Sequence, residues 1–379
     1  MKLMEKIEVR RVPLGCYEEF HLVLKDLDYE NNFLSEILSA LEKESILPIR
    51  IAFFGDAGKL EEAAVSIGKR WPCSIVGDST FSQEKANVHI KGVKILTGQS
   101  QKVEMGSEVL GYHFNFPDFE YLDIGGACFK NKPADFGDEV KGEYEKINRI
   151  LKHYEFPPGN IYRFWNFIMD IDGNYPAFNK VRDAYFKKNS ILKFSAATGI
   201  EAEIGREKRI NLGLEAIRPK ESSLFRWETV SSDMQSEAYD YLREVSGLLS
   251  GPKFSRAVVL DFPAASQKKI YISGTSSVNR KGESIFPNDM EKNVEYVLQS
   301  FGHLLEKNGF SWNDLVSVYV YCKNKKAFEA FEKAYSSKKF NFSYNLAFTN
   351  ICRGNFLFEI EGIAAKSSKE IIFSDFQKS

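Results

Sequence analysis

Three arginine-containing segments are the strongest candidates for chemistry in this sequence. Each places an Arg beside aromatic or small residues, in the stretches 162–166 (YRFWN), 252–257 (PKFSRA) and 351–353 (ICR). Removing a guanidinium group from water without a partner is costly, so an Arg held among apolar side chains indicates a bound anion. The alternative for Arg163 is a half-exposed side chain that stacks on Trp165 or pairs with Asp170.

Two acids follow the last of these arginines. Glu359 and Glu361 alternate with apolar residues in the stretch 356–363 (FLFEIEGI), which is the pattern of a β-strand. Because alternate residues of a strand point to the same side, we expect both carboxyl groups on one face of a sheet. The alternative is an ordinary pair of carboxylates on a solvated strand face.

Motifs for phosphate or metal binding fail on their spacing. The stretch 55–59 (GDAGK) has two residues between its glycines, where a phosphate loop needs four, and no Ser or Thr follows its Lys. The stretch 170–174 (DIDGN) begins like a calcium loop, but Tyr175 and Val181 occupy the sixth and twelfth positions, so we predict a turn. The histidines are isolated, with no HxH or HxxxH pair, and we therefore predict metal-free chemistry.

Alternating strands and helices are expected to position these residues. In the first half, the pattern predicts strands at 51–54, 87–96 and 108–116, and helices at 59–68 and 143–153. In the last third, it predicts strands at 269–274, 315–322 and 356–363, and helices at 289–308 and 325–334. This order indicates an α/β sandwich with helices on one side of a sheet. The polar stretch 219–250 is interpreted as a long loop or a variable helix.

The composition limits the number of domains and the kinds of partner. The 379 residues, of which 43% are hydrophobic and 27% charged, suggest about two domains of a globular protein. With 51 basic and 52 acidic residues, the net charge is −1, which argues against nucleic acid or a membrane surface as the partner. The start of the chain lacks the apolar run of a signal peptide, and no stretch approaches the roughly 20 apolar residues of a membrane helix. Five widely spaced cysteines without a CxxC pair fit a reducing compartment, so we expect a cytoplasmic protein.

Taken together, the motifs occur in the order seen in chorismatases, and the sequence resembles that family over about residues 145–365. The matching stretches are 162–166, 194–200 (FSAATGI), 251–257, 272–278 (ISGTSSV) and 352–362 with its Cys-Arg and FEIEG. The last third also resembles the RidA (YjgF) fold, whose closing strand has the pattern EIExIA, here 359–364 (EIEGIA).

The resemblance implies an α+β fold of the RidA-like, chorismate mutase-like kind, a mixed sheet with helices on one face, in two related domains. The N-terminal α/β domain, residues 1–145, would be a diverged RidA-like unit. Residues 146–379 would form the C-terminal RidA-like domain that carries the chorismatase motifs.

The resemblance further implies a cofactor-free enzyme that releases pyruvate from chorismate, a small molecule with two carboxylates. Arginine suits such anions because it binds them through two hydrogen bonds, and Arg163, Arg256 and Arg353 are the expected substrate-binding residues, with Arg353 on one carboxylate. Cleavage of an enol ether requires protonation of its terminal methylene carbon, which a carboxylic acid kept neutral by burial can supply. By resemblance Glu359 is that acid. Glu361 is either the acid itself or a like charge that raises the pKa of Glu359.

The product depends on what attacks after protonation. Water would give a dihydroxycyclohexadienoate, whereas the neighbouring ring hydroxyl would lead through an epoxide to 3-hydroxybenzoate. Cys352 before the last Arg, and the small Gly274 at a strand end, resemble the type of chorismatase that makes 3-hydroxybenzoate, which we therefore expect. Without that comparison, Cys352 reads as a small buried hydrophobic residue.

The sequence departs from the family pattern in three places. Gly354 stands where the family usually has Pro, and Lys187-Lys188 stand where Gly-Arg is expected, although Arg182 is retained. The stretch 219–250 replaces upstream motifs that are not recognisable here. Two other functions therefore stay open, a RidA-type imine deaminase and a non-catalytic anion-binding protein, and we expect a monomer or a small homo-oligomer.

Overall fold

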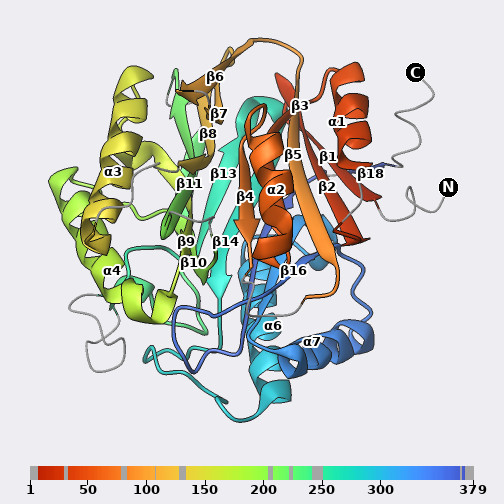
Figure 1. Ribbon diagram of the computed structural model, residues 1–379, viewed down its shortest axis with the longest axis vertical. Helices are drawn as coiled ribbons and strands as arrows, with labels where there is room; N and C mark the ends of the chain where they lie inside the picture. The colour runs from red at the N-terminus through yellow and green to blue at the C-terminus, as the bar shows by residue number, and fades with distance from the viewer. Residues whose placement is uncertain are drawn as a thin grey trace.

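In the computed structural model, the chain forms three six-stranded β-sheets, each with a pair of α-helices against it (Figure 1). The residues that the structure describes are 7–29, 33–77, 83–106, 108–127, 134–203, 208–221, 225–240, 251–367 and 369–371. Among the described helices, none combines the length and apolar character needed to cross a bilayer.

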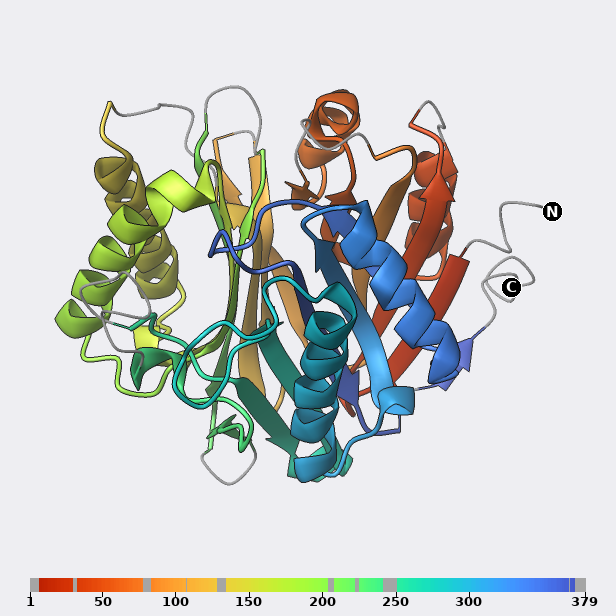
Figure 2. The ribbon, with the colours of Figure 1, turned by 90° about the horizontal axis from the view of Figure 1, so that it is seen from below.

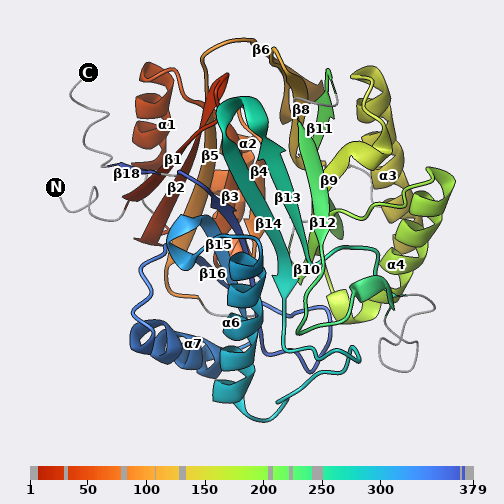
Figure 3. The ribbon, with the colours of Figure 1, turned by 180° about the vertical axis from the view of Figure 1, so that it is seen from behind.

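The first sheet comes from the N-terminal quarter of the chain and closes with a strand from the C-terminal end. Its order is β18-β1-β2-β5-β3-β4, and Figure 3 shows β18 beside β1. The strands are β1 (Ile7–Pro13), β2 (Tyr17–Leu27), β3 (Leu47–Phe54), β4 (Cys73–Val76), β5 (Ala86–Ile95) and β18 (Lys369–Ile371). The helices are α1 (Phe33–Lys43) and α2 (Ala57–Gly68).

The second sheet occupies the middle of the sequence, in the order β6-β7-β8-β11-β9-β10. Its strands are β6 (Gln99–Met105), β7 (Glu108–Asn115), β8 (Phe119–Ala127), β9 (Ile161–Ile168), β10 (Ala196–Glu201) and β11 (Ile210–Pro219). Its helices are α3 (Phe136–His153) and α4 (Ile171–Lys188).

The third sheet uses the last 150 residues or so, in the order β12-β13-β14-β17-β15-β16. Its strands are β12 (Arg226–Val230), β13 (Ala257–Phe262), β14 (Gln267–Thr275), β15 (Leu315–Cys322), β16 (Asn345–Phe348) and β17 (Phe358–Ala365). Its helices are α6 (Met290–Lys307) and α7 (Lys325–Ser337).

The three sheets repeat one plan. In each of them five strands pair antiparallel and the sixth pairs parallel with its neighbour, as β4 does with β3, β10 with β9 and β16 with β15. The helices also fall at the same two places in every copy, before and after the strand that precedes the parallel one. The predicted fold class, mixed sheets with helices on one face, is confirmed, and the repeated unit occurs three times rather than twice.

The predicted division at residue 145 does not coincide with these units. The middle sheet takes strands from both sides of that residue, and residue 145 itself lies within α3. As a statement about independently folding domains, the division into 1–145 and 146–379 stays a prediction.

Register relates the copies residue by residue through their central strands β5, β11 and β17. At one position the cross-strand pairs are Lys91–Arg50, Glu215–Arg163 and Glu361–Tyr319. Two residues earlier, the pairs are His89–Ala52, Gly213–Trp165 and Glu359–Tyr321. His89, Gly213 and Glu359 are therefore counterparts, as are Lys91, Glu215 and Glu361.

Hydrophobic burial fixes how the copies assemble. Each sheet packs one face on its own helices, as α6 does through Val294, Leu298, Phe301 and Leu305. The opposite faces meet in a shared interior rich in aromatic residues from all three sheets, among them Tyr17, Phe114, Tyr121, Tyr162 and Tyr271. Figure 2 shows the result, with helix pairs outside and sheets between them.

Two helices, α1 and α4, were not predicted from the sequence. The segment 170–174 was predicted as a turn, but Asp170, with φ of 48°, caps the start of α4, which continues to Lys188. Gly173 and Pro176 lie in its first turns and weaken the helical signal. Burial of Phe178, Phe186 and their neighbours against the second sheet stabilises the helix in spite of them.

The polar stretch 219–250 is partly described. It contributes β12 and a short 3-10 turn at Ala238–Asp240, while its residues 222–224 and 241–250 lie outside the described part of the chain.

Candidate active site

A cavity lies between the second and third sheets, and both contribute to its walls. Five of the six predicted site residues line it, namely Arg256, Gly274, Cys352, Arg353 and Glu359. The second sheet and α4 add Asn166, Tyr175 and Arg182. The two sheets are joined here because the Ala197 amide donates to Ser273 Oγ at 2.9 Å and the Gly274 amide to Thr198 Oγ1 at 3.1 Å.

Glu359 is a buried acid in the wall of this cavity. It lies near the start of β17 and is 4% exposed. Burial raises its pKa to about 7, because desolvation outweighs the Ser276 hydrogen bond and the charges of Arg256 and Arg163, all of which lower it. Ser276 Oγ donates to Glu359 Oε2 at 2.8 Å and fixes the carboxyl group in place. A substantial fraction of Glu359 is therefore protonated at neutral pH.

Gly274 is a glycine because the Glu359 carboxyl lies against it. A Cβ atom built at this position would lie 2.1 Å from Glu359 Oε1, far inside contact distance, and 3.1 Å from a methyl carbon of Thr198. Any side chain here would displace the acid. The backbone at residue 274 thus sets where the Glu359 carboxyl lies.

Glu361 points toward the same side of the sheet but is fully engaged. Its two oxygens accept from the Arg163 guanidinium and Thr198 Oγ1, and from Trp165 Nε1 at 3.2 Å and the Tyr321 hydroxyl at 2.7 Å. A carboxylate that fills its lone pairs with four donors has no position left for a proton of its own. The geometry therefore favours Glu359 over Glu361 as the acid.

Arg163 is the predicted site residue that the structure places elsewhere. It is 2% exposed, donates to Glu361 and Thr198, and lies with its guanidinium carbon 4.5 Å from the centre of the Trp165 ring. It is not among the residues that line the cavity, and burial lowers its pKa to about 10. The alternatives from the sequence were a half-exposed Arg163 that stacks on Trp165 or pairs with Asp170. In the structure Arg163 does lie over the Trp165 ring, but it is buried and its ion pair is with Glu361.

The remaining arginines converge on the cavity from three elements. Arg256, just before β13, donates through Nε and Nη2 to the Ser236 carbonyl, at 2.9 and 2.5 Å. Arg353 donates to the Gly282 carbonyl at 2.9 Å. Arg182 on α4 is 4% exposed and donates to Asn179, while its Nε has no partner among the described residues.

Arg182 thus joins Arg256 and Arg353 as a third cation in the wall. The sequence singled it out only as a retained member of a weakened segment. A buried guanidinium without a carboxylate nearby is costly unless a ligand supplies the anion.

Cys352 and Tyr175 lie next to each other in the cavity wall, and both side chains are neutral. Burial, followed by the charge of Glu359, raises the pKa of Cys352 to about 12, and its thiol is hydrogen-bonded with Tyr175. Burial also raises the pKa of Tyr175 well above its ordinary value. A thiol that stays protonated is a poor nucleophile, so Cys352 shapes the cavity rather than attacking a substrate.

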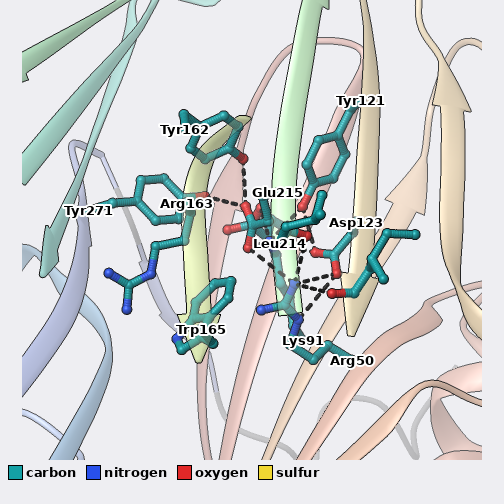
Figure 4. A network of polar contacts seen from close by, with 12 residues as sticks. Arg50, Lys91, Tyr121, Asp123, Tyr162, Arg163, Trp165, Leu214, Glu215 and Tyr271 are labelled. Carbon is teal, nitrogen blue, oxygen red and sulfur yellow. Dashed lines mark hydrogen bonds and ion pairs between the residues drawn. The ribbon is translucent and has the colours of Figure 1, made fainter. Parts of the chain in front are cut away.

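Behind the cavity lies a buried ionic network that joins the three sheets (Figure 4). Lys91 Nζ contacts Glu215 Oε1 at 2.8 Å and Asp123 Oδ2 at 3.2 Å, and Arg50 Nη2 contacts Asp123 Oδ1 at 2.7 Å. Burial would raise the pKa of Glu215, but Lys91 and Arg50 lower it to about 2. Further partners are Lys269, Glu19, Tyr121, Tyr162 and Tyr271.

Trp165 connects this network to Glu361, two residues after Glu359 on β17. The guanidinium groups of Arg50 and Arg163 both lie over its ring, at 3.9 and 4.5 Å from the centroid, and its indole nitrogen donates to Glu361. This network was not predicted from the sequence. The available signal was the recurrence of one pattern, VHIKGV at 88–93, LGLEAI at 212–217 and FEIEGI at 358–363, with a charge at the same position.

In the described part of the chain, no three or more His, Cys, Asp or Glu residues lie where they could hold a metal ion together. The expectation of metal-free chemistry stays a prediction.

Similarity to known proteins agrees with this architecture. The family Endoribonuclease L-PSP matches residues 252–366, which include the helices of the third sheet and all of its strands except β12. No curated protein matches the chain. A crystal structure of a chorismatase matches with a TM-score of 0.65 and 15% sequence identity, over 91% of this chain and 98% of that one.

Smaller proteins match one unit at a time. They include a protein of the conserved Rid family from Yersinia pestis, 19% identical, and yeast Mmf1, 18% identical, both with a TM-score of 0.28 and both covering 37% of this chain and 98% of their own. The RidA-like unit predicted for the C-terminal part is confirmed. The chorismatase resemblance, predicted for about residues 145–365, is confirmed as a likeness of fold and extends well before residue 145, since 91% of the chain is covered: the chain has the fold of a chorismatase.

Proposed function

We propose that this protein is a chorismatase, which releases pyruvate from chorismate and forms 3-hydroxybenzoate. The observation that carries the proposal is a buried acid with a pKa of about 7, Glu359, in the wall of a cavity that Arg182, Arg256 and Arg353 also line. This combination suits a dianion that must be protonated on carbon. The shared fold supports the proposal, and the substrate is inferred from the chemistry of the cavity.

The arginines account for binding. Chorismate has a ring carboxylate and an enolpyruvyl carboxylate, and two or three guanidinium groups around one cavity can hold both through paired hydrogen bonds. Arg353 and Arg256 come from the third sheet and Arg182 from α4, so the substrate would bridge the two units. Arg163, in this proposal, neutralises Glu361 and so holds the strand that carries Glu359.

Glu359 accounts for the chemistry. Its carboxyl proton is transferred to the terminal methylene carbon, and the π electrons of the enol ether form the new C–H bond. The product is an oxocarbenium ion, which the new Glu359 carboxylate stabilises at short range. Protonation thereby turns the enolpyruvyl group into a leaving group.

Departure of pyruvate completes the reaction. The neighbouring ring hydroxyl attacks the ring carbon that bears the ether, the C–O bond electrons form the carbonyl of pyruvate, and the hydroxyl proton returns to Glu359. The resulting epoxide opens and loses a ring proton to give 3-hydroxybenzoate, with no water consumed. If water attacks the oxocarbenium carbon instead, the products are pyruvate and a dihydroxycyclohexadienoate.

The test is incubation of the purified protein with chorismate, followed by chromatography of the products. We expect the wild type to form one 3-hydroxybenzoate for each pyruvate. The control Glu329→Gln, which changes an exposed acid on α7, should form both products at the same rate as the wild type. Glu359→Gln should release pyruvate about 10³-fold more slowly while keeping its fold by circular dichroism. Undiminished turnover by Glu359→Gln would refute the role of Glu359, and unreacted chorismate with the wild type would refute the function.

A further inference from the structure

One hydrogen-bond acceptor in the cavity wall has no donor among the described residues. Asn166 lies on β9, is 2% exposed and lines the cavity. Its Nδ2 donates to the Thr198 carbonyl at 2.9 Å. Its Oδ1 is buried and has no hydrogen-bond partner among the described residues.

The orientation of this amide follows from its neighbour. The Thr198 carbonyl can only accept a hydrogen bond, so the NH₂ group of Asn166 must face it. The oxygen is thereby left without a partner as a pure acceptor. Buried acceptors without a donor are rare in folded proteins, and each calls for an explanation.

The chemistry of the cavity indicates what the missing donor is. A carboxylate ligand held by Arg182, Arg256 and Arg353 offers only acceptors, which cannot satisfy Asn166 Oδ1. A hydroxyl group on the same ligand can satisfy it, because a hydroxyl donates one hydrogen bond and keeps its lone pairs.

We propose that Asn166 Oδ1 accepts a hydrogen bond from a ring hydroxyl of the substrate and makes the site selective for hydroxylated ring carboxylates. This inference rests on the proposed function in one respect, the choice of chorismate as the ligand. Chorismate has one hydroxyl, on the carbon next to the enol ether. Asn166 would orient this hydroxyl through the hydrogen bond, with a lone pair directed at the ring, which is the arrangement that attack on the ether carbon requires. As attack proceeds, the hydroxyl proton would leave the hydrogen bond with Asn166 and pass to the Glu359 carboxylate.

The test crosses a change in the protein with a change in the ligand. We compare the dissociation constants of two chorismate analogues whose side-chain double bond is reduced, so that neither can be protonated on carbon and neither reacts. One analogue keeps the ring hydroxyl and the other lacks it, and each is bound to the wild type and to Asn166→Leu, whose side chain has nearly the same size. Because any general damage to the cavity weakens the binding of both analogues, only the ratio of their dissociation constants reports on the hydroxyl. The wild type should prefer the hydroxylated analogue by about 10- to 100-fold, and Asn166→Leu by less than about 3-fold.

Asn211→Leu is the matched control. Asn211 on β11 is also 2% exposed with an unpartnered Oδ1 in the described structure, but it does not line the cavity. It should keep the wild-type ratio. A ratio that Asn166→Leu leaves unchanged, or that Asn211→Leu abolishes equally, would overturn the inference.

A binding measurement separates this inference from the proposed function. In calorimetry, 3-hydroxybenzoate should bind the wild type at least 10-fold more tightly than benzoate, and the preference should vanish in Asn166→Leu. If this holds while chorismate is not turned over, the function is wrong and the hydroxyl site stands. If chorismate is turned over but neither ratio depends on Asn166, the function stands and the hydroxyl site is wrong. Failure of both ligands to bind overturns the hydroxyl site.

Discussion

Glu359 and His89 occupy the same position on equivalent strands, yet their surroundings differ. Glu359 lies between the second and third sheets, against a cavity, and accepts from Ser276. His89 lies against the third sheet, and both of its ring nitrogens are occupied, Nδ1 by the Tyr319 hydroxyl at 2.8 Å and Nε2 by His21 at 3.1 Å. At this position, Glu359 faces a cavity in the third sheet, whereas His89 in the first sheet is held by hydrogen bonds on both ring nitrogens.

Within the described residues, the hydrogen bonds that follow from His89 leave no polar atom of this series open to a ligand. His21 continues to Glu19 at 2.7 Å, and Glu19 to Lys269 at 2.6 Å, so the polar atoms satisfy one another inside the protein. Burial lowers the pKa of both histidines and keeps them neutral. The third counterpart, Gly213, has no side chain at all. Of the three equivalent positions, only Glu359 combines an acid with access to a cavity.

The comparison teaches that repetition of a fold conserves backbone positions, not chemistry. The counterparts two residues later on these strands, Lys91, Glu215 and Glu361, also differ in chemistry. Lys91 and Glu215 neutralise each other, while Glu361 is held by Arg163. In both places, buried charge is matched by opposite charge, which is what makes it tolerable in the interior. Glu359 is the exception, since its charge is suppressed by burial.

The largest predicted effect sets Glu359→Gln against His89→Gln. A general acid typically contributes about 10²- to 10⁴-fold to a rate, so Glu359→Gln should lower the rate of pyruvate release by about 10³-fold. His89→Gln should keep kcat within about 3-fold and cost about 1 kcal/mol of stability, because His89 serves only hydrogen bonds within the protein. Coupled pyruvate assays and urea unfolding measure both. Equal loss of activity in the two variants would destroy the comparison.

The next largest effect is the loss of stability expected for Lys91→Met, the counterpart of Glu215 and Glu361. Removing this cation leaves Glu215 and Asp123 buried with less compensation, and breaking such a network typically costs about 3–5 kcal/mol. The exposed pair of Lys333 with Glu291 is the control, since Lys333→Met should change the unfolding free energy by less than about 1 kcal/mol. Urea denaturation of the wild type and both variants measures these free energies of unfolding. A loss below about 1 kcal/mol for Lys91→Met would show that the network does not hold the three units together.

Gly274→Ala should have a smaller effect, confined to activity. The added methyl group would push the Glu359 carboxyl away from its place beside Ser276, and a displacement of about 1 Å can cost about 10²-fold in rate. Gly199→Ala is the matched control in the same cavity, because its Cβ would meet Tyr175 at an ordinary 3.6 Å. We expect kcat to fall about 10- to 100-fold in the first variant and less than about 3-fold in the second. Similar losses in both would mean that the cavity tolerates no methyl group anywhere, and would remove the special role of residue 274.

Local patterns made much of the third sheet predictable from the sequence. The strand at 315–322 is β15 with the same limits, and the helix predicted at 289–308 is α6, which Asp289 caps and which ends before Asn308 and Gly309. Burial periodicity and capping residues act over a few residues, so a single sequence reveals them. The pairing of β18 with β1 and the repetition of three sheets depend on contacts across hundreds of residues and leave only a weak trace in the pattern VHIKGV, LGLEAI and FEIEGI.

The candidate site was predictable where motifs resembled those of chorismatases. Arg256, Cys352, Arg353 and Glu359 meet at one cavity, as expected from motifs far apart in the sequence. The sequence could not show that Arg163 is claimed by Glu361, because two buried groups 198 residues apart choose each other only when the sheets assemble. It could not assign a role to Asn166 either, since an unpartnered oxygen is a property of the assembled cavity.

The smallest predicted effect is a pH dependence that belongs to Glu359 and not to His89. Because burial raises the pKa of Glu359 to about 7 and the acid form is the active one, kcat/KM should be nearly constant below pH 6 and about 10-fold lower at pH 8 than at pH 6. The pKa of Cys352, about 12, lies above this range, so its thiol does not contribute.

Ser276→Ala sharpens this last test, because the Ser276 hydrogen bond lowers the pKa of Glu359. Its loss should move the falling limb of the profile to higher pH, so that activity at pH 8 declines less relative to pH 6. His89→Gln, which leaves Glu359 and Ser276 in place, should keep the limb where it is in the wild type. Initial rates between pH 5.5 and 8.5 for the three proteins provide the measurement. A limb that moves with His89→Gln, or a rate that rises with pH, would show that the titrating group is not the acid beside the cavity.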